Sequence, residues 1–167
     1  TFTYTVREIR QSAGGVNYDS HMGMWQITVT DDLTGQLKAQ TRTNAAYPTT
    51  FTNTYQAQPV SVRFRAHKTL NDPDHTGIRL QAGQYEFTCV EDKTGGQAGT
   101  VKTNDQRGDV LFDAISYTKT GTYDYTIGET PGDRGGVTYD TAKHHVRVTV
   151  TDNGEGQLLA DVKYDGG

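Results

Sequence analysis

Four polar side chains fall on the apolar face of predicted β-strands. Lys68 belongs to the alternate set of PVSVRFRAHKTL that contains valine, phenylalanine and alanine, and Glu129 ends the matching set of TYDYTIGE. Glu8 occupies the same place in FTYTVRE, and Asn53 shares its parity with the aromatic residues of TTFTNTY. Because successive side chains of a strand point to opposite faces, all four residues are predicted to face an apolar interior.

Two kinds of chemistry would account for such residues. An isolated buried charge costs several kcal/mol, so a lysine and a glutamate in one interior could form a buried salt bridge, with an asparagine beside it. A bulge could instead break the alternation and release the side chains to solvent. Alternatively, desolvation lowers the pKa of a lysine and raises that of a glutamic acid, so that a neutral amine could attack the asparagine carboxamide. Ammonia would leave, and the glutamate would polarise the carbonyl and move the protons. The strand pattern alone leaves these interpretations open.

The chain also resembles itself at a constant offset of 121 residues. Residues 1–46 align with 122–167 without a gap, and 17 of the 46 positions are identical. Such regularity predicts tandem repeats, with the C-terminal part of one unit over 1–57 and most of the next unit over 58–167. The boundary is expected in QAQPVS, where Pro59 interrupts any continuing strand.

The elements that position these residues are predicted to be antiparallel strands. Apolar and polar residues alternate from Trp25 to Thr30, and they alternate again from Val146 to Thr151. Asn153-Gly154 is typical of a tight hairpin turn. Short strands rich in threonine, tyrosine and valine favour an all-β fold and a β-sandwich.

The runs HKTL, LQAGQYEFTCVED, KTNDQRGDVLFDAISYTKTGTYDYTIGET and FTNTY closely resemble a known family. They are similar to the isopeptide-containing, FctA-like and CnaB-type domains of pilins and adhesins on Gram-positive bacteria. The resemblance implies Ig-like β-sandwiches in which a first-strand lysine joins a last-strand asparagine, promoted by a glutamate on a middle strand. Carried over by position, it implies that Lys68 is the amine, Glu8 and Glu129 are the promoters, and Asn53 is the acceptor.

The chain departs from the family because no unit contains all three residues. The lysine matching Glu8 and Asn53 would precede Thr1, and the asparagine matching Lys68 and Glu129 would be residue 174 (53 + 121). In a hairpin of residues 51–55 with 60–70, Asn53 would lie opposite residue 62, about 20 Å along the strand from Lys68. An intrachain bond is therefore not expected, whereas a second copy could donate its FTNTY strand and form a covalent fibre.

Composition excludes several other functions. The 167 residues carry 16 Lys+Arg and 20 Asp+Glu, with no basic stripe for nucleic acid and no apolar run long enough to span a membrane. The single cysteine, Cys89, is expected to be a buried structural thiol, and His144-His145 a solvated pair. We expect no metal or cofactor, and the sequence has no motif of a hydrolase or kinase.

The expected function is a structural stalk or adhesin segment at the Gram-positive cell wall, not an enzyme. Its expected partners are neighbouring repeats, a second copy by strand exchange, or a host protein or glycan. Two alternatives use the same scaffold: a ligand-binding adhesive domain, favoured by aromatic loops near Tyr47 or Tyr164, and a pilin subunit. Neither a lysine-containing pilin motif nor LPxTG occurs in the sequence.

Overall fold

The computed structural model describes residues 1–43 and 46–165, and all of their regular structure is β. The chain is therefore an all-β protein with several antiparallel sheets, as predicted. The strands are β1 (Phe2–Arg7), β2 (Val16–Asn17), β3 (Met22–Asp31), β4 (Leu37–Thr43), β5 (Thr54–Tyr55), β6 (Val60–His67), β7 (Glu86–Glu91), β8 (Lys102–Thr103), β9 (Asp109–Tyr117), β10 (Gly121–Thr130), β11 (Lys143–Asp152) and β12 (Leu158–Tyr164). The described residues form no helix that could cross a membrane.

The chain divides into two compact units. Unit 1 comprises Thr1–Ala57 with Gly154–Gly156, and unit 2 comprises Gln58–Asn153 with Gln157–Gly167. Each unit is described separately below.

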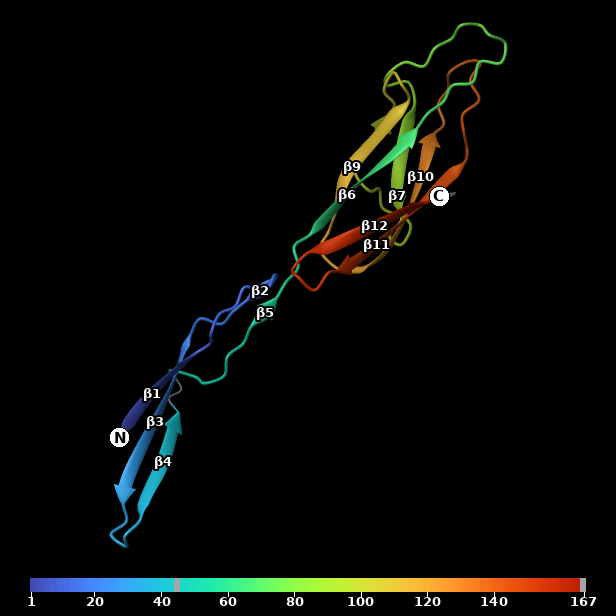
Figure 1. Ribbon diagram of the computed structural model, residues 1–167. Coiled ribbons are helices and arrows are strands. Elements are labelled where there is room, and N and C mark those ends of the chain that lie inside the picture. The colour runs from blue at the N-terminus through green and yellow to red at the C-terminus, as the bar shows by residue number, and fades with distance from the viewer. Residues whose placement is uncertain (44–45, 166–167) are drawn as a thin grey trace. The chain divides into compact units, whose positions relative to one another are not determined.

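Unit 2 contains two sheets that pack face to face (Figure 1). One sheet has the order β12-β11-β10-β7-β8, and the other pairs β6 with β9. Phe64 of β6 is fully buried, and its ring lies 5.0 Å from that of Tyr125 on β10 and 6.5 Å from that of Tyr164 on β12. The core of unit 2 therefore lies between the inward sides of these two sheets.

The alternation along β6 is unbroken, which decides the direction of Lys68. Arg63 pairs with Ala114 and Arg65 with Leu111, so between these pairs one residue of β6, Phe64, opposes two residues of β9, 112 and 113. The bulge thus lies in β9, where it shifts the buried positions from even to odd numbers. A bulge that releases Lys68 from the interior is excluded.

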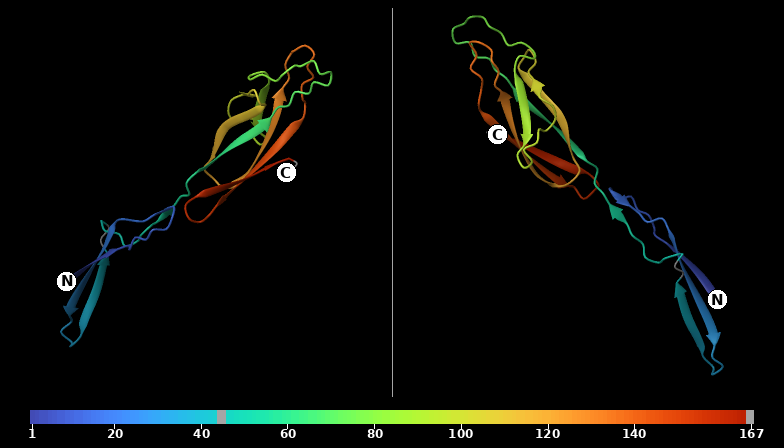
Figure 2. Two further views of the ribbon diagram at one scale, coloured as in Figure 1. Left: turned by 45° about the horizontal axis from the view of Figure 1, so that its top comes forward. Right: turned by 180° about the vertical axis from the view of Figure 1, so that it is seen from behind.

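Unit 1 contains the three-stranded sheet β1-β3-β4 and the short pair β2-β5; Figure 2 shows the three strands, in blue and cyan, from two further sides. The bounds of β3 and β4 match those of β11 and β12 at the offset of 121, and the register of β1 with β3 matches that of β10 with β11. Adding 121 to the residue numbers of β3 gives the range of β11, and adding it to the pair Phe2↔Ile27 gives the observed pair Tyr123↔Val148.

The prediction that the apolar side chains of β1 are buried is wrong. Phe2 is 57% exposed and Tyr4 is 51% exposed, whereas Tyr125, which matches Tyr4, is 3% exposed. The physical reason is that Tyr125 lies under the Phe64 ring of an opposing sheet, and the exposure of Tyr4 shows that no such layer covers it within the described residues. Alternation predicts which side of a strand is apolar, but burial requires a second layer.

The predicted hairpin of β11 and β12 is confirmed and Gly154 has φ of 74°, but the connection is not a two-residue turn, because it runs from residue 153 to 157 and the Asn153 N–H donates to Gln157 O at 3.1 Å. Such a positive φ costs glycine little, which explains the residue at this place.

Candidate functional site

Lys68 and Glu129 meet inside unit 2. The Lys68 Nζ donates a hydrogen bond to Glu129 Oε2 at 2.7 Å, and the two side chains are 11% and 3% exposed. Lys68 directly follows β6, and Glu129 lies on β10, opposite Phe87 of β7. The sequence correctly predicted that both residues point into the interior.

A close backbone contact fixes the position of Lys68. Its N–H donates to Gly108 O at 2.7 Å, and Gly108 has φ of 97°. A Cβ at residue 108 would overlap the carbonyl oxygen of Lys68. Only glycine therefore lets the start of β9 approach Lys68 this closely.

The pair lies beside aromatic side chains and beside a cavity whose lining is partly polar. The Lys68 Nζ lies 4.5 Å from the centroid of the Tyr85 ring, and Tyr85 is 1% exposed. A cavity of about 290 Å³ adjoins the pair, and Phe87 and Ile127 contribute to its lining. Glu129 Oε2 accepts a second hydrogen bond from the Asp140 N–H at 3.3 Å, whereas Oε1 is buried and accepts none from the described residues.

Glu8 and Asn53 meet in unit 1. The Asn53 Nδ2 donates to Glu8 Oε1 at 2.5 Å, and its Oδ1 accepts the backbone N–H of Asp19 at 2.8 Å. Glu8 Oε2 is buried and has no hydrogen-bond partner in the described part of the chain. Asn53 itself is exposed, so the prediction that it faces an interior is wrong: like Tyr4 of β1, it is not covered by a second layer among the described residues.

The two pairs are complementary halves of one arrangement. Glu8 and Glu129 are 121 positions apart. Glu8 accepts a hydrogen bond from a carboxamide on Oε1, and its Oε2 has no partner among the described residues. Glu129 accepts one from an amine on Oε2, and its Oε1 has no such partner. Each unit therefore contains one glutamate that is hydrogen-bonded through one carboxylate oxygen to a nitrogen-bearing side chain, and whose other oxygen is buried without a partner among the described residues.

A family model agrees with this geometry. The model of the FctA domain, described as a Spy0128-like isopeptide containing domain, matches residues 1–56 and 64–167. The chain belongs to this family. Its members are structural domains and not enzymes, and they occur in the surface pilins of Gram-positive bacteria. A comparison with curated proteins found no match.

Within this isopeptide domain, the sequence reasoning missed the role of Asp19. Asp19 contacts Asn53 through its backbone N–H. The type of its side chain therefore gives no indication of this contact. A signal was nevertheless present, since Tyr18-Asp19 recurs as Tyr139-Asp140 in the self-alignment. The two aspartates also occupy equivalent places: the Asp19 N–H donates to Asn53, which is bound to Glu8, and the Asp140 N–H donates to Glu129.

Cys89 is a buried thiol, and Tyr164 is the last residue of β12. Cys89 is 1% exposed, as predicted, and burial raises the pKa of its thiol to about 11. Tyr164, a candidate for ligand binding, accepts the N–H of Arg65 at 3.2 Å and packs on Phe64.

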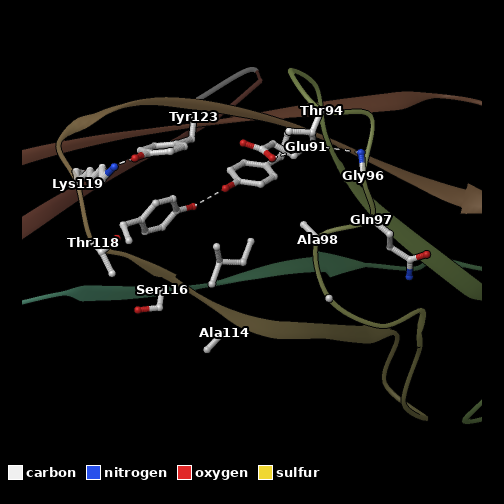
Figure 3. A pocket seen from close by; sticks show the side chains of 14 residues that line it. Glu91, Thr94, Gly96, Gln97, Ala98, Ala114, Ser116, Thr118, Lys119 and Tyr123 are labelled. Atoms are coloured by element: carbon white, nitrogen blue, oxygen red, sulfur yellow. Dashed lines mark hydrogen bonds between the residues drawn. The ribbon is translucent and has the colours of Figure 1, made fainter.

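A second cavity of unit 2, of about 490 Å³, lies among the end of β9, the start of β10 and the loop after β7 (Figure 3). Tyr117 and Tyr125 line it, and their hydroxyl groups are hydrogen-bonded to each other at 3.0 Å. Burial, together with this hydrogen bond, raises the pKa of Tyr117 above its usual range. The two hydroxyl groups therefore stabilise the wall of the cavity.

Proposed function

We propose that this chain is a stalk or adhesin segment of a Gram-positive cell-surface protein, stabilised by Lys–Asn isopeptide bonds that form without an enzyme. In this proposal its units are Ig-like, CnaB-type sandwiches that repeat about every 121 residues. Lys68 is the amine of one bond and Asn53 the acceptor of another, and Glu129 and Glu8 are the respective promoters. The protein lies outside the cell, and neighbouring repeats are its first partners.

One observation carries the proposal: each glutamate binds a different one of the two groups, an amine or a carboxamide, and leaves its other carboxylate oxygen without a partner among the described residues. A structural salt bridge explains Lys68 and Glu129, but it does not explain why Glu8 binds a carboxamide at the equivalent position. Buried polar atoms are normally hydrogen-bonded. The unpartnered Oε1 of Glu129 and Oε2 of Glu8 therefore support a complete site that binds both reactants at once.

The proposed reaction is a transamidation. The amine nitrogen, as the neutral amine, attacks the carboxamide carbon, and the tetrahedral intermediate carries its charge on the former carbonyl oxygen. The glutamate accepts a proton from the attacking nitrogen and delivers it to the amide nitrogen, which leaves as ammonia. One C–N bond forms, one C–N bond breaks, and no oxidant or cofactor is needed.

A synthetic peptide tests the unit 2 half of this site. The peptide YPTTFTNTYQ, residues 47–56, carries the acceptor asparagine and is incubated with the intact chain. The expected product has the summed mass of chain and peptide less one ammonia, and tandem mass spectrometry locates the link at Lys68. No adduct should form with Lys68→Ala, with Glu129→Gln, or with a peptide in which the asparagine is replaced by alanine.

The same experiment distinguishes the alternatives. If the peptide binds but ammonia is never lost, the Lys68–Glu129 pair is a structural salt bridge and the proposed chemistry is wrong. Covalent dimers of the chain in the absence of peptide would instead support strand exchange between copies. The Glu129→Gln variant keeps the shape of the side chain, so its failure to react would identify proton transfer as the missing step.

A further inference from the structure

The segment that carries Asn53 is fastened at four positions by two residues of the neighbouring loop. The Asp19 N–H donates to Asn53 Oδ1 at 2.8 Å, and Asp19 Oδ2 accepts the N–H of Thr52 at 2.9 Å. The His21 ring stacks on Phe51 with centroids 4.4 Å apart, and its Nε2 lies 2.8 Å from Pro48 O. Asp19 and His21 therefore hold residues 48–53, the segment that carries the proposed acceptor Asn53.

The hydrogen bonds of the His21 ring require two protons. Its Nδ1 lies 2.6 Å from Asp19 Oδ1, and its Nε2 faces the Pro48 carbonyl. A carboxylate and a carbonyl oxygen are both acceptors, so each ring nitrogen must donate. Only the imidazolium form does so, because a neutral ring turns one lone pair toward an acceptor.

We propose that Asp19 and His21 form a pH-dependent clamp that positions the Asn53 carboxamide, with the Asp19 N–H as the donor to its carbonyl oxygen. This inference rests on the proposed isopeptide chemistry. Asp19 and His21 are positioning residues, since neither side chain touches the reacting carbon. The Asp19 N–H acts as an oxyanion donor, stabilising the negative charge that develops on Oδ1 when an amine attacks.

The direction of the pH dependence follows from the contacts of the ring. Asp19 is the titratable group that contacts His21 in the described part of the chain; the other contacts are the Pro48 carbonyl and the Phe51 ring. The hydrogen bond to Asp19, and next that to Pro48, raise the pKa of His21 above 6.5. The clamp is therefore complete below pH 6.5 and is lost as the pH rises through the higher value of the folded chain.

Unit 2 provides a natural comparison for the clamp. Asp140 matches Asp19, and its carboxylate accepts the N–H of Ala142 at 2.8 Å, as Asp19 accepts the N–H of His21 at 3.0 Å. The turn is thus the same in both units, but alanine stands where unit 1 has histidine. The pH dependence should accordingly belong to unit 1 alone.

Nuclear magnetic resonance of the intact chain tests the clamp itself. With ¹⁵N-labelled histidine, both ring nitrogens of His21 should be protonated at pH 6, and the titration midpoint should exceed 6.5. The side-chain amide protons of Asn53 should exchange faster across the same transition. A midpoint at or below 6.5, or Asn53 signals that do not respond to the titration, would overturn the proposal.

A capture experiment tests the link to chemistry. The peptide VSVRFRAHKTL, residues 60–70, supplies a lysine to Asn53 in a Lys68→Ala chain, so that only unit 1 can react. His21→Gln cannot titrate, and its adduct should form roughly tenfold more slowly at pH 6, as expected for the loss of a charged hydrogen bond. The ratio of the two rates should approach one above the His21 midpoint.

The outcomes separate the two proposals. A rate ratio that is independent of pH would overturn the clamp while leaving the isopeptide reaction intact. No adduct at any pH, with the coupled titration of His21 and Asn53 still present, would overturn the reaction and support the clamp. In the reverse direction, Ala142→His should accelerate capture of YPTTFTNTYQ at Lys68 below the histidine midpoint, and an unchanged rate would count against the clamp.

Discussion

Replacing Lys68 with methionine should destabilise unit 2 strongly in the unreacted chain. The substitution keeps the apolar stem but removes the amine that lies 2.7 Å from a carboxylate only 3% exposed. Removing one partner of a buried ion pair costs about 3 to 5 kcal/mol, because the remaining charge is uncompensated. Since Lys68 keeps 11% of its side-chain exposure, we expect the lower end, about 3 kcal/mol. For a unit of this size the melting temperature should fall by roughly 10 to 20 °C.

The assay is thermal and urea unfolding of four chains: wild type, Lys68→Met, Glu129→Gln and the double variant. The double variant removes both charges, so it should regain most of the loss and give a coupling energy of about 2 kcal/mol or more. Lys93→Met, at an exposed position after β7, is the matched control and should change stability by less than about 0.5 kcal/mol. A loss below about 1 kcal/mol for Lys68→Met would show that solvent screens the pair, and the argument from burial would be wrong.

Three further predictions follow from single contacts. Cys89 should resist a thiol reagent in the folded chain and react only after unfolding, because burial raises its pKa to about 11. Gly108→Ala should destabilise unit 2 in thermal unfolding and slow peptide capture at Lys68, since a Cβ there meets the Lys68 carbonyl and the φ of 97° disfavours alanine. Trp25, the single tryptophan, is 37% exposed, and its fluorescence should shift to the blue when VSVRFRAHKTL binds unit 1; a peptide with alanine in place of Phe64 should give a smaller shift.

The sequence predicted the strands and the direction of Lys68 and Glu129 because both depend on local alternation. Lys68, directly after β6, continues the alternation that buries Phe64, and Tyr125 and Glu129 share one side of β10, whatever the partner strands are. The bulge that could have broken this rule lies in β9, away from both residues.

Two features could not be read from local pattern. The exposure of Tyr4 depends on whether a second layer covers β1, and the sequence of β1 alone does not show whether that layer is present. The contact between Asp19 and Asn53 uses a backbone N–H, which every residue except proline possesses. Asp19 recurs as Asp140 at the offset of 121, but only the structure shows that its backbone N–H contacts Asn53.

The spacing of the reactive residues also determines when the proposed bonds can form. Lys68 and Glu129 are 61 residues apart, and Glu8 and Asn53 are 45 apart, so neither pair meets in a local turn of the unfolded chain. Glu129 reaches Lys68 only when β10 lies in its sheet and β6 has packed against it. The same burial that makes an unreacted pair costly also excludes water from it. The proposed reaction would therefore follow folding, and the proposed bond would stabilise a sandwich that has already acquired its native packing.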